Sequence, residues 1–196
     1  MLINKQIYFA HIPRTGGRYI YKNLFKEHLC EHADFDLGEL YNHREIPHLT
    51  FPEYEEYLNK NIDQKFAVIR DPVTRFVSQL KSSVFKDRIE SILKDQESLN
   101  KFINDALIDK NNLGNWFVPQ IKFLDYKTKL WKFEDGLQDN FFKWLTNNFG
   151  LQIKSKKLSS DYFINGIDIK FNVELNNNQV NYIKNYYYQD YKVLGY

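Results

Sequence analysis

The stretch Ile7-Tyr8-Phe9-Ala10-His11-Ile12-Pro13-Arg14-Thr15-Gly16-Gly17 decides the fold class of this 196-residue chain. Its first part, up to Ile12, is a mostly apolar run that stops at a proline, which is typical of a buried strand in a parallel sheet. After the two glycines, apolar residues recur at helical spacing, and this pattern predicts a helix from about Arg18 to about Cys30. A strand, a glycine-containing turn and a helix together form the repeating unit of an α/β fold.

A second strand and helix follow the same pattern. The apolar residues 66–69 predict a buried strand, and Asp71-Pro72 then signals a helix start, since aspartate caps helix N-termini and proline suits the first turn. A third strand is predicted over 130–133, and further helices are predicted from Pro52, over 89–108, over about 141–150 and around Ile183, with mostly loop over 31–50 and a polar excursion over 154–172. This order predicts one α/β domain over residues 1–196, with three layers and a mainly parallel sheet between flanking helices.

Composition and charge narrow the function classes. Lys plus Arg total 27 against 25 for Asp plus Glu, a net charge of +2, so we expect no general nucleic-acid partner. Cys30 is the sole cysteine, which excludes an intramolecular disulfide and a cysteine-based metal cluster. The chain has neither an apolar run of membrane-spanning length nor a signal-peptide pattern at its start. We therefore expect a cytoplasmic protein without a membrane partner.

The turn at residues 13–18 has the chemistry of an anion site. Adjacent glycines let backbone N–H groups face a ligand, and the following helix adds the positive end of its dipole. Arg14, Thr15 and Arg18 can add charged and hydroxyl hydrogen bonds. The nucleotide-binding pattern G-x-x-x-x-G-K-[ST] is absent. Taken alone, a Gly-Gly turn between a strand and a helix is often only a tight turn.

A second candidate anion site follows the strand at 66–69. Arg70 stands at the carboxyl end of that strand, where ligands bind in open α/β sheets. Thr74 and Ser78 lie one helical turn apart on one face of the following helix. An arginine and a serine facing one crevice form a phosphate clamp, although Arg70 in a surface ion pair is the simpler interpretation. Two anion sites at two strand ends predict a ligand with two separated phosphates.

The two motifs together resemble those of the PAPS-dependent sulfotransferases, in particular the carbohydrate (heparan-type) branch. The loop is similar to that family's 5′-phosphosulfate loop, His-Ile-Pro-Lys-Thr-Gly-Gly, and residues 70–78 are similar to its 3′-phosphate motif. Weaker similarity extends to Pro119-Gln120, to Phe133-Glu134 and to the ending Asp190-Tyr191…Gly195-Tyr196. The resemblance implies a P-loop-like nucleotide-binding architecture. It also implies transfer of a sulfuryl group from 3′-phosphoadenosine-5′-phosphosulfate (PAPS), with no metal required, to an acceptor hydroxyl on a small molecule or a glycan.

The resemblance also assigns roles to particular residues. Arg70 and Ser78 would bind the 3′-phosphate, and Arg14 occupies the position of the family's catalytic lysine. Arginine keeps its charge and offers a planar fork, so it can still stabilise charge on the leaving group. The backbone that would bind the 5′-phosphate belongs to Thr15, Gly16, Gly17 and Arg18.

A base must accept the proton of the acceptor hydroxyl, and histidine is the usual base near neutral pH. In the family that the loop resembles, this histidine comes from the segment before the second strand, which makes His48 the first candidate and His43 the next. The other three histidines are His11, which we expect to be structural, and His28 and His32, at the end of the first predicted helix.

Two other functions remain open at this stage. One is a small-molecule kinase with a divergent phosphate loop, which the missing loop lysine and the lack of an evident magnesium-binding acid disfavour. The other is a nucleotide-binding module without catalysis, in which Arg14 in place of lysine marks lost chemistry.

Overall fold

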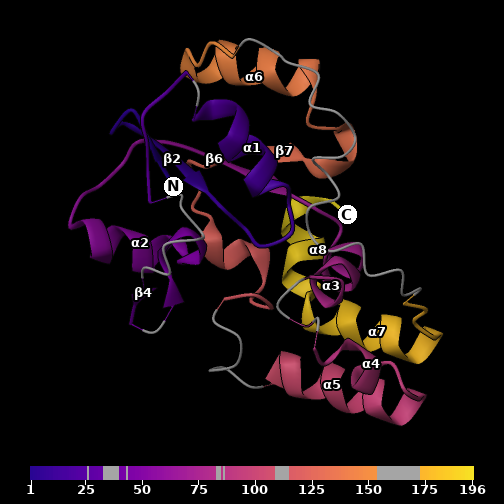
Figure 1. The fold of residues 1–196 in the computed structure, drawn as a ribbon. Coiled ribbons are helices and arrows are strands. Elements are labelled where there is room, and N and C mark those ends of the chain that lie inside the picture. The colour runs from indigo at the N-terminus through magenta and orange to yellow at the C-terminus, as the bar shows by residue number, and fades with distance from the viewer. Residues whose placement is uncertain are drawn as a thin grey trace.

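The computed structural model describes residues 1–25, 27–32, 40–42, 44–82, 85, 87–108, 115–153 and 173–196. Within these ranges a five-stranded sheet has the order β3-β1-β2-β6-β7. Its parallel part consists of β2 (Ile7–Ala10), β6 (Gln64–Ile69) and β7 (Lys129–Lys132), while β1 (Leu2–Ile3) and β3 (Cys30–Glu31) are antiparallel at one edge. The predicted α/β class with a mainly parallel sheet is confirmed (Figure 1).

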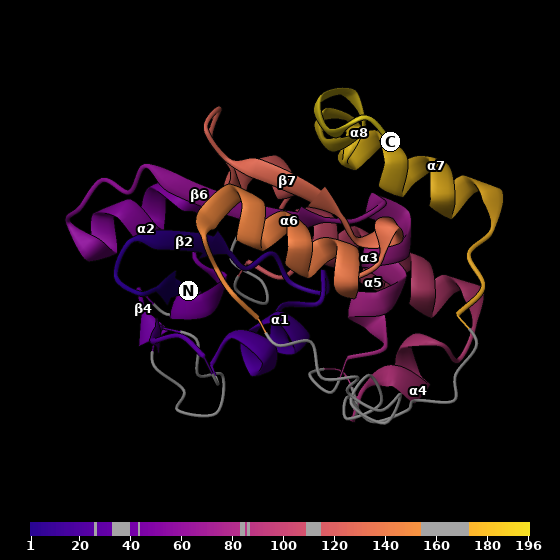
Figure 2. The same ribbon diagram turned by 90° about the horizontal axis from the view of Figure 1, so that it is seen from above.

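Helices cover both faces of this sheet. Alternate strand residues such as Phe9 and Phe66 pack against α1 (Gly17–Leu24) and α6 (Asp139–Phe149) on one face. Figure 2 shows α6 lying across the strands on that side. Residues of the opposite alternation pack under a second group of helices, which consists of η1 (Ile46–His48), α2 (Phe51–Leu58), η3 (Gln120–Phe123) and α8 (Tyr188–Leu194). The alternation places a hydrophobic layer on each side of the sheet.

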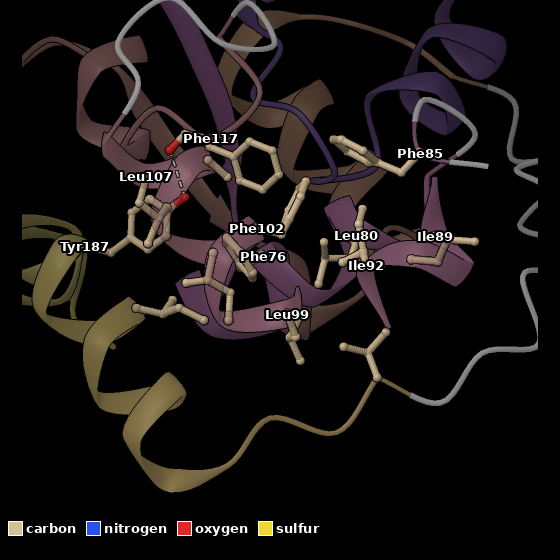
Figure 3. Close-up of a cluster of buried hydrophobic side chains, with 14 residues drawn as sticks. Phe76, Leu80, Phe85, Ile89, Ile92, Leu99, Phe102, Leu107, Phe117 and Tyr187 are labelled. Atoms are coloured by element: carbon tan, nitrogen blue, oxygen red, sulfur yellow. Dashed lines mark hydrogen bonds between the residues drawn. The ribbon is translucent and has the colours of Figure 1, made fainter. Parts of the chain in front are cut away.

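A third hydrophobic cluster packs a group of helices around α3 (Pro72–Leu80), the helix that follows β6. Its other helices are α4 (Ile89–Ile92), α5 (Gln96–Ile108) and α7 (Asn177–Tyr186). Phe76 and Leu80 of α3 are fully buried there, as the sequence predicted (Figure 3). This packing holds α3, which bears Ser78, in a fixed position at the end of the sheet.

The sequence placed several boundaries correctly. Helix α3 begins at Asp71-Pro72, where Asp71 Oδ1 accepts a hydrogen bond of 2.8 Å from the Thr74 N–H. Helix α2 begins beside Pro52, and α6 ends at Gly150 with a φ of 67°. None of the helices in the described part of the chain is long and apolar enough to cross a membrane. The polar excursion at 154–172 lies outside the described residues.

Other boundaries were wrong. The first helix ends at Leu24 instead of continuing to Cys30, because Cys30 and Glu31 pair with β1 as an edge strand. Leu29, which the helical pattern counted as a buried position, is 55% exposed. Tertiary strand pairing therefore outweighs the local helical pattern here.

Three further segments differ from prediction: two predicted helices are each broken in two, and a predicted loop contains short strands and a helix. The helix predicted over 89–108 is two helices, because Asp95 caps the N–H of Ser98 and begins α5 anew. The last helix likewise breaks at Tyr187 into α7 and α8. The segment predicted as mostly loop contains β4 (Leu40–Tyr41), β5 (Arg44–Glu45) and η1.

Candidate functional site

The two predicted anion motifs meet at the carboxyl ends of two neighbouring strands, β2 and β6. Strands β2 and β6 are parallel neighbours, so the loop after β2 and the start of α3 leave the sheet side by side. Arg14 Nε donates a hydrogen bond of 3.1 Å to Ser78 Oγ, and Arg70 Nη1 donates one of 3.1 Å to the Arg14 carbonyl. The structure therefore joins Arg14, Arg70 and Ser78 in one hydrogen-bonded group.

Backbone geometry explains the residue types in the loop. Gly16 has a φ of 90°, in the left-handed region that favours glycine, and a Cβ at that position would collide with Leu137. At Gly17 a Cβ would collide with the ring of His11. Arg14 also has a left-handed φ, of 68°, which is unusual for a residue with a side chain. The loop thus brings its backbone into close contact with the His11 ring, just after β2, and with Leu137, just before α6.

The Thr15 side chain has an internal role in the loop. It is fully buried, and its Oγ1 donates a hydrogen bond of 2.9 Å to the Ile12 carbonyl. The Thr15 hydroxyl proton is thus used within the loop in this structure, and the Thr15 backbone N–H is the candidate contact to a ligand. Arg18, at the first turn of α1, is exposed.

Arg70 is held on three sides. Its Nε donates a hydrogen bond of 3.3 Å to Thr74 Oγ1, and its guanidinium lies 4.5 Å from the centre of the Phe133 ring. The third contact is Nη1 to the Arg14 carbonyl. The helix face shared by Thr74 and Ser78 faces the two arginines, as their spacing predicted.

The electrostatics favour an anion. The pKa of Arg14 is lowered to about 10 by burial, with further lowering from the charges of Arg70 and Arg18. Burial also lowers the pKa of Arg70, partly offset by Glu134 and Asp71. Arg14 still carries its charge at neutral pH. Helices α1 and α3 begin at the carboxyl ends of β2 and β6, so the positive ends of both helix dipoles lie on the side of the sheet where Arg14 and Arg70 lie. A bound phosphate would relieve the repulsion among these cations.

The structure also gives contacts to residues that the sequence did not place in the site. Glu134 Oε1 accepts the N–H of Asp71 at 2.8 Å, while the Tyr191 hydroxyl donates to Asp71 Oδ2 at 3.1 Å. Gln120 hydrogen-bonds the backbone of Arg70. The weak similarity at Pro119-Gln120 and Phe133-Glu134 was the available signal in the sequence; it gave no role to Gln120, and Glu134 was only a candidate base after His48 and His43.

His48 lies in η1 and is buried, with 4% of its surface exposed. Its Nδ1 lies 3.0 Å from the His11 carbonyl, which can only accept, so Nδ1 carries the proton and Nε2 is unprotonated in the neutral ring. Nε2 lies 3.6 Å from Glu45 Oε2. The ring also packs edge-on against Trp116, with 5.5 Å between ring centres.

His48 contacts the loop after β2 through His11. The two imidazole rings are 4.5 Å apart between centres, and the His11 ring lies against Gly17. Leu49 and Phe51 are buried, so packing fixes the segment that carries His48. His48 therefore lies on the same side of the molecule as the glycines, but in a packed setting instead of a solvated loop.

Burial controls the protonation of both rings. It lowers the pKa of His48 to about 4, and it lowers the pKa of His11 well below its usual value, with a further contribution from His48. Both histidines are therefore neutral at pH 7. His43, the second candidate, lies outside the described residues.

The other two histidines contact separate parts of the chain. His28 bridges Asn4 and the Gln152 carbonyl, and His32 lies 3.4 Å from the Tyr57 hydroxyl. Within the described ranges, no group of three or more His, Cys, Asp or Glu side chains is placed to hold a metal ion.

Comparisons with known proteins give no match. A scan against protein-family models finds none, and searches of curated proteins and of solved structures find none either. The functional assignment therefore depends on the residues of the two motifs and on the geometry that brings them together.

Proposed function

We propose that this protein is a sulfotransferase with a P-loop-like nucleotide site. It transfers the sulfuryl group of PAPS to an acceptor hydroxyl, and the acceptor class that we propose is a carbohydrate. The observation that supports this most is the hydrogen-bonded group of Arg14, Ser78 and Arg70. It makes one continuous cationic site from two motifs at neighbouring strand ends. Such a site suits a ligand with two separated phosphates, as PAPS has.

In this proposal each phosphate has its own ligands. The backbone of residues 15–18 at the N-terminus of α1 binds the 5′-phosphosulfate. Arg70 and Ser78 bind the 3′-phosphate, and because Ser78 Oγ accepts from Arg14, its own hydroxyl proton remains for a phosphate oxygen. Arg14 then lies between the two phosphate positions.

The chemical step follows from these positions. The acceptor oxygen forms a bond to sulfur while the bond from sulfur to the phosphate oxygen breaks, and the electron pair leaves on the phosphate. The Arg14 guanidinium stabilises that developing charge without giving up a proton. The acceptor proton passes to His48 Nε2, the unprotonated ring atom, and Glu45 then stabilises the imidazolium.

A nucleotide-binding module without catalysis is the second candidate, and one observation favours it. His48 is almost fully buried, and a base with a pKa of about 4 is weaker than one with a pKa near 7. This candidate keeps both phosphate motifs and lacks only the chemical step.

Ligand-induced stabilisation tests the proposal. The thermal midpoint is measured with 3′,5′-ADP, with AMP and with Mg-ATP at equal concentrations. A ligand at 100 times its dissociation constant stabilises the fold by about 2.7 kcal/mol, so 3′,5′-ADP should raise the midpoint most. Equal shifts with 3′,5′-ADP and AMP would contradict a 3′-phosphate site.

Turnover separates the two candidates. Release of 3′,5′-ADP from PAPS is measured with a panel of glycans and small hydroxyl compounds as acceptors. Acceptor-dependent release supports the sulfotransferase, whereas nucleotide binding without any release supports the module.

A further inference from the structure

The side-chain amide of Gln120 hydrogen-bonds the backbone of Arg70, the first residue after β6. Its Oε1 accepts the N–H of Arg70 at 3.0 Å, and its Nε2 donates to the Arg70 carbonyl at 2.8 Å. The last ladder pair of β6 and β7 is Ile69 with Lys132, one residue before Arg70. The side-chain amide of Gln120 therefore satisfies both backbone groups of the first residue beyond the strand.

Gln120 is itself fixed by a buried carboxylate on α8. Asp190 Oδ2 accepts the Gln120 N–H at 2.8 Å, and Asp190 Oδ1 accepts the Ile121 N–H at 3.1 Å. Gln120 and Asp190 are both 0% exposed. The carboxylate satisfies the first N–H groups of η3, which the short helix leaves without an internal partner.

A second contact holds α8 to the same segment of chain. The Tyr187 hydroxyl, at the junction of α7 and α8, donates a hydrogen bond of 2.8 Å to the Phe117 carbonyl (Figure 3). Tyr187 is fully buried in the helical cluster around α3. Tyr187 and Asp190 thus hold the segment from Phe117 to Ile121 at both of its ends, and the side chain of Gln120 in this segment contacts Arg70.

From these contacts we propose that Gln120, held by Asp190, is a positioning residue that aims the Arg70 guanidinium at a 3′-phosphate. Two hydrogen bonds from one planar amide fix the backbone of Arg70 and with it the direction of the side chain. That direction brings Nη1 to the Arg14 carbonyl and the guanidinium over Phe133. This inference rests on the proposed function, because it assigns Arg70 to the 3′-phosphate.

Glutamine suits this position because it offers a donor and an acceptor in one plane. Methionine has nearly the same length and bulk but provides neither group at this strength, so Gln120→Met removes both hydrogen bonds and preserves most of the packing. Asp190→Asn is a milder second variant, because its amide group would face a backbone N–H while its oxygen keeps one contact.

The experiment measures dissociation constants of 3′,5′-ADP and AMP by calorimetry for the wild type and both variants. A charge-assisted hydrogen bond that loses its geometry should cost roughly tenfold in affinity. We expect Gln120→Met to weaken 3′,5′-ADP binding by about that factor and AMP binding by less than about twofold. Asp190→Asn should also lower the ratio of the 3′,5′-ADP affinity to the AMP affinity.

Gln179→Met is the matched control. Gln179 is also a buried glutamine, on α7, and its side chain donates to Gln96 and Asn100. Its replacement lowers stability without touching the contacts of Arg70, so the ratio of the two affinities should stay at the wild-type value.

The outcomes separate this inference from the proposed function. If folded Gln120→Met and Asp190→Asn both discriminate the two nucleotides as well as the wild type does, the positioning role is wrong while the 3′-phosphate site stands. If the wild type binds 3′,5′-ADP and AMP equally, the proposed function itself is wrong, and the positioning role is wrong with it.

Discussion

Arg14 Nε donates a hydrogen bond of 3.1 Å to Ser78 Oγ, between residues 64 positions apart in the sequence. This contact ties the loop after β2 to the helix after β6, and Arg70 strengthens the connection by donating to the Arg14 carbonyl. The residues expected to bind two different phosphates therefore already form one group. A ligand that bridges the two motifs would exchange these contacts for contacts with its own oxygens.

Arg70→Ala should weaken 3′,5′-ADP binding by roughly ten- to a hundredfold, since a hydrogen bond to a charged group contributes ~1.5–3 kcal/mol. AMP lacks the 3′-phosphate and should lose little affinity. Calorimetry with both nucleotides checks this, with Arg88→Ala, an exposed arginine at the start of α4, as the control. An equal loss for both nucleotides would show that Arg70 does not read the 3′-phosphate.

Arg14→Lys should keep sulfuryl transfer, while Arg14→Ala should lose most of it. Arginine and lysine at position 14 both place a cation near the bridging oxygen. Removing one such stabilising group typically adds ~2.7–4 kcal/mol to the barrier. The measurement is kcat for release of 3′,5′-ADP from PAPS at saturating acceptor. Normal turnover by Arg14→Ala would mean that the loop binds the nucleotide and takes no part in the chemistry.

His48→Ala should lower turnover by ~10²–10⁴-fold, the usual contribution of a general base, and leave 3′,5′-ADP affinity nearly unchanged. His48 contacts His11, at the start of the loop, through both its ring and its backbone carbonyl and reaches none of the expected phosphate ligands by these contacts, so nucleotide binding should depend little on it. His43→Ala should do much less. Turnover that survives in His48→Ala and falls in His43→Ala would move the base to His43.

Gly17→Ala should destabilise the fold by about 1–3 kcal/mol, the usual cost of overpacking, because its Cβ would collide with the His11 ring. Urea unfolding measures this free energy. The double variant Gly17→Ala/His11→Ala removes the obstructing ring, so its loss should be smaller than the sum of the two single losses. Simple additivity of the single losses would contradict the contact.

Acid should weaken the fold through His48. Its pKa is 6.5 in an unfolded chain and about 4 in the folded protein, so between these pH values the unfolded state binds more protons. The free energy of unfolding should therefore fall as pH drops through this window, by about 3 kcal/mol from this residue. The stability that His48 contributes is fully present above pH 6.5.

His48→Asn tests that pH dependence, because asparagine keeps an N–H for the His11 carbonyl but does not titrate. Unfolding in urea is measured at several pH values from about 4 to 7 for the wild type and the variant. The variant should lose less stability on acidification, with the remaining loss due in part to His11, whose pKa is lowered in the same direction. Parallel curves for the two proteins would show that His48 is accessible to protons in the folded state.

Local signals in the sequence determined the parts of the site that depend on neighbouring residues. Asp71-Pro72 predicted the start of α3, and the adjacent glycines predicted a tight turn between β2 and α1. The spacing of Thr74 and Ser78 predicted that they share a helix face, because helical periodicity relates residues only a few positions apart. These features follow from backbone conformation and periodicity within about ten residues.

The tertiary structure decided which distant groups meet. It joined Arg14 to Ser78, placed Gln120 on the backbone of Arg70, and buried His48 under His11 and Trp116. Contacts of this kind join positions tens of residues apart, so they depend on how whole helices and strands pack and leave no local pattern in the sequence. For the same reason Cys30 is in a strand despite its helical spacing, because β1 supplies backbone partners that a local pattern does not reveal.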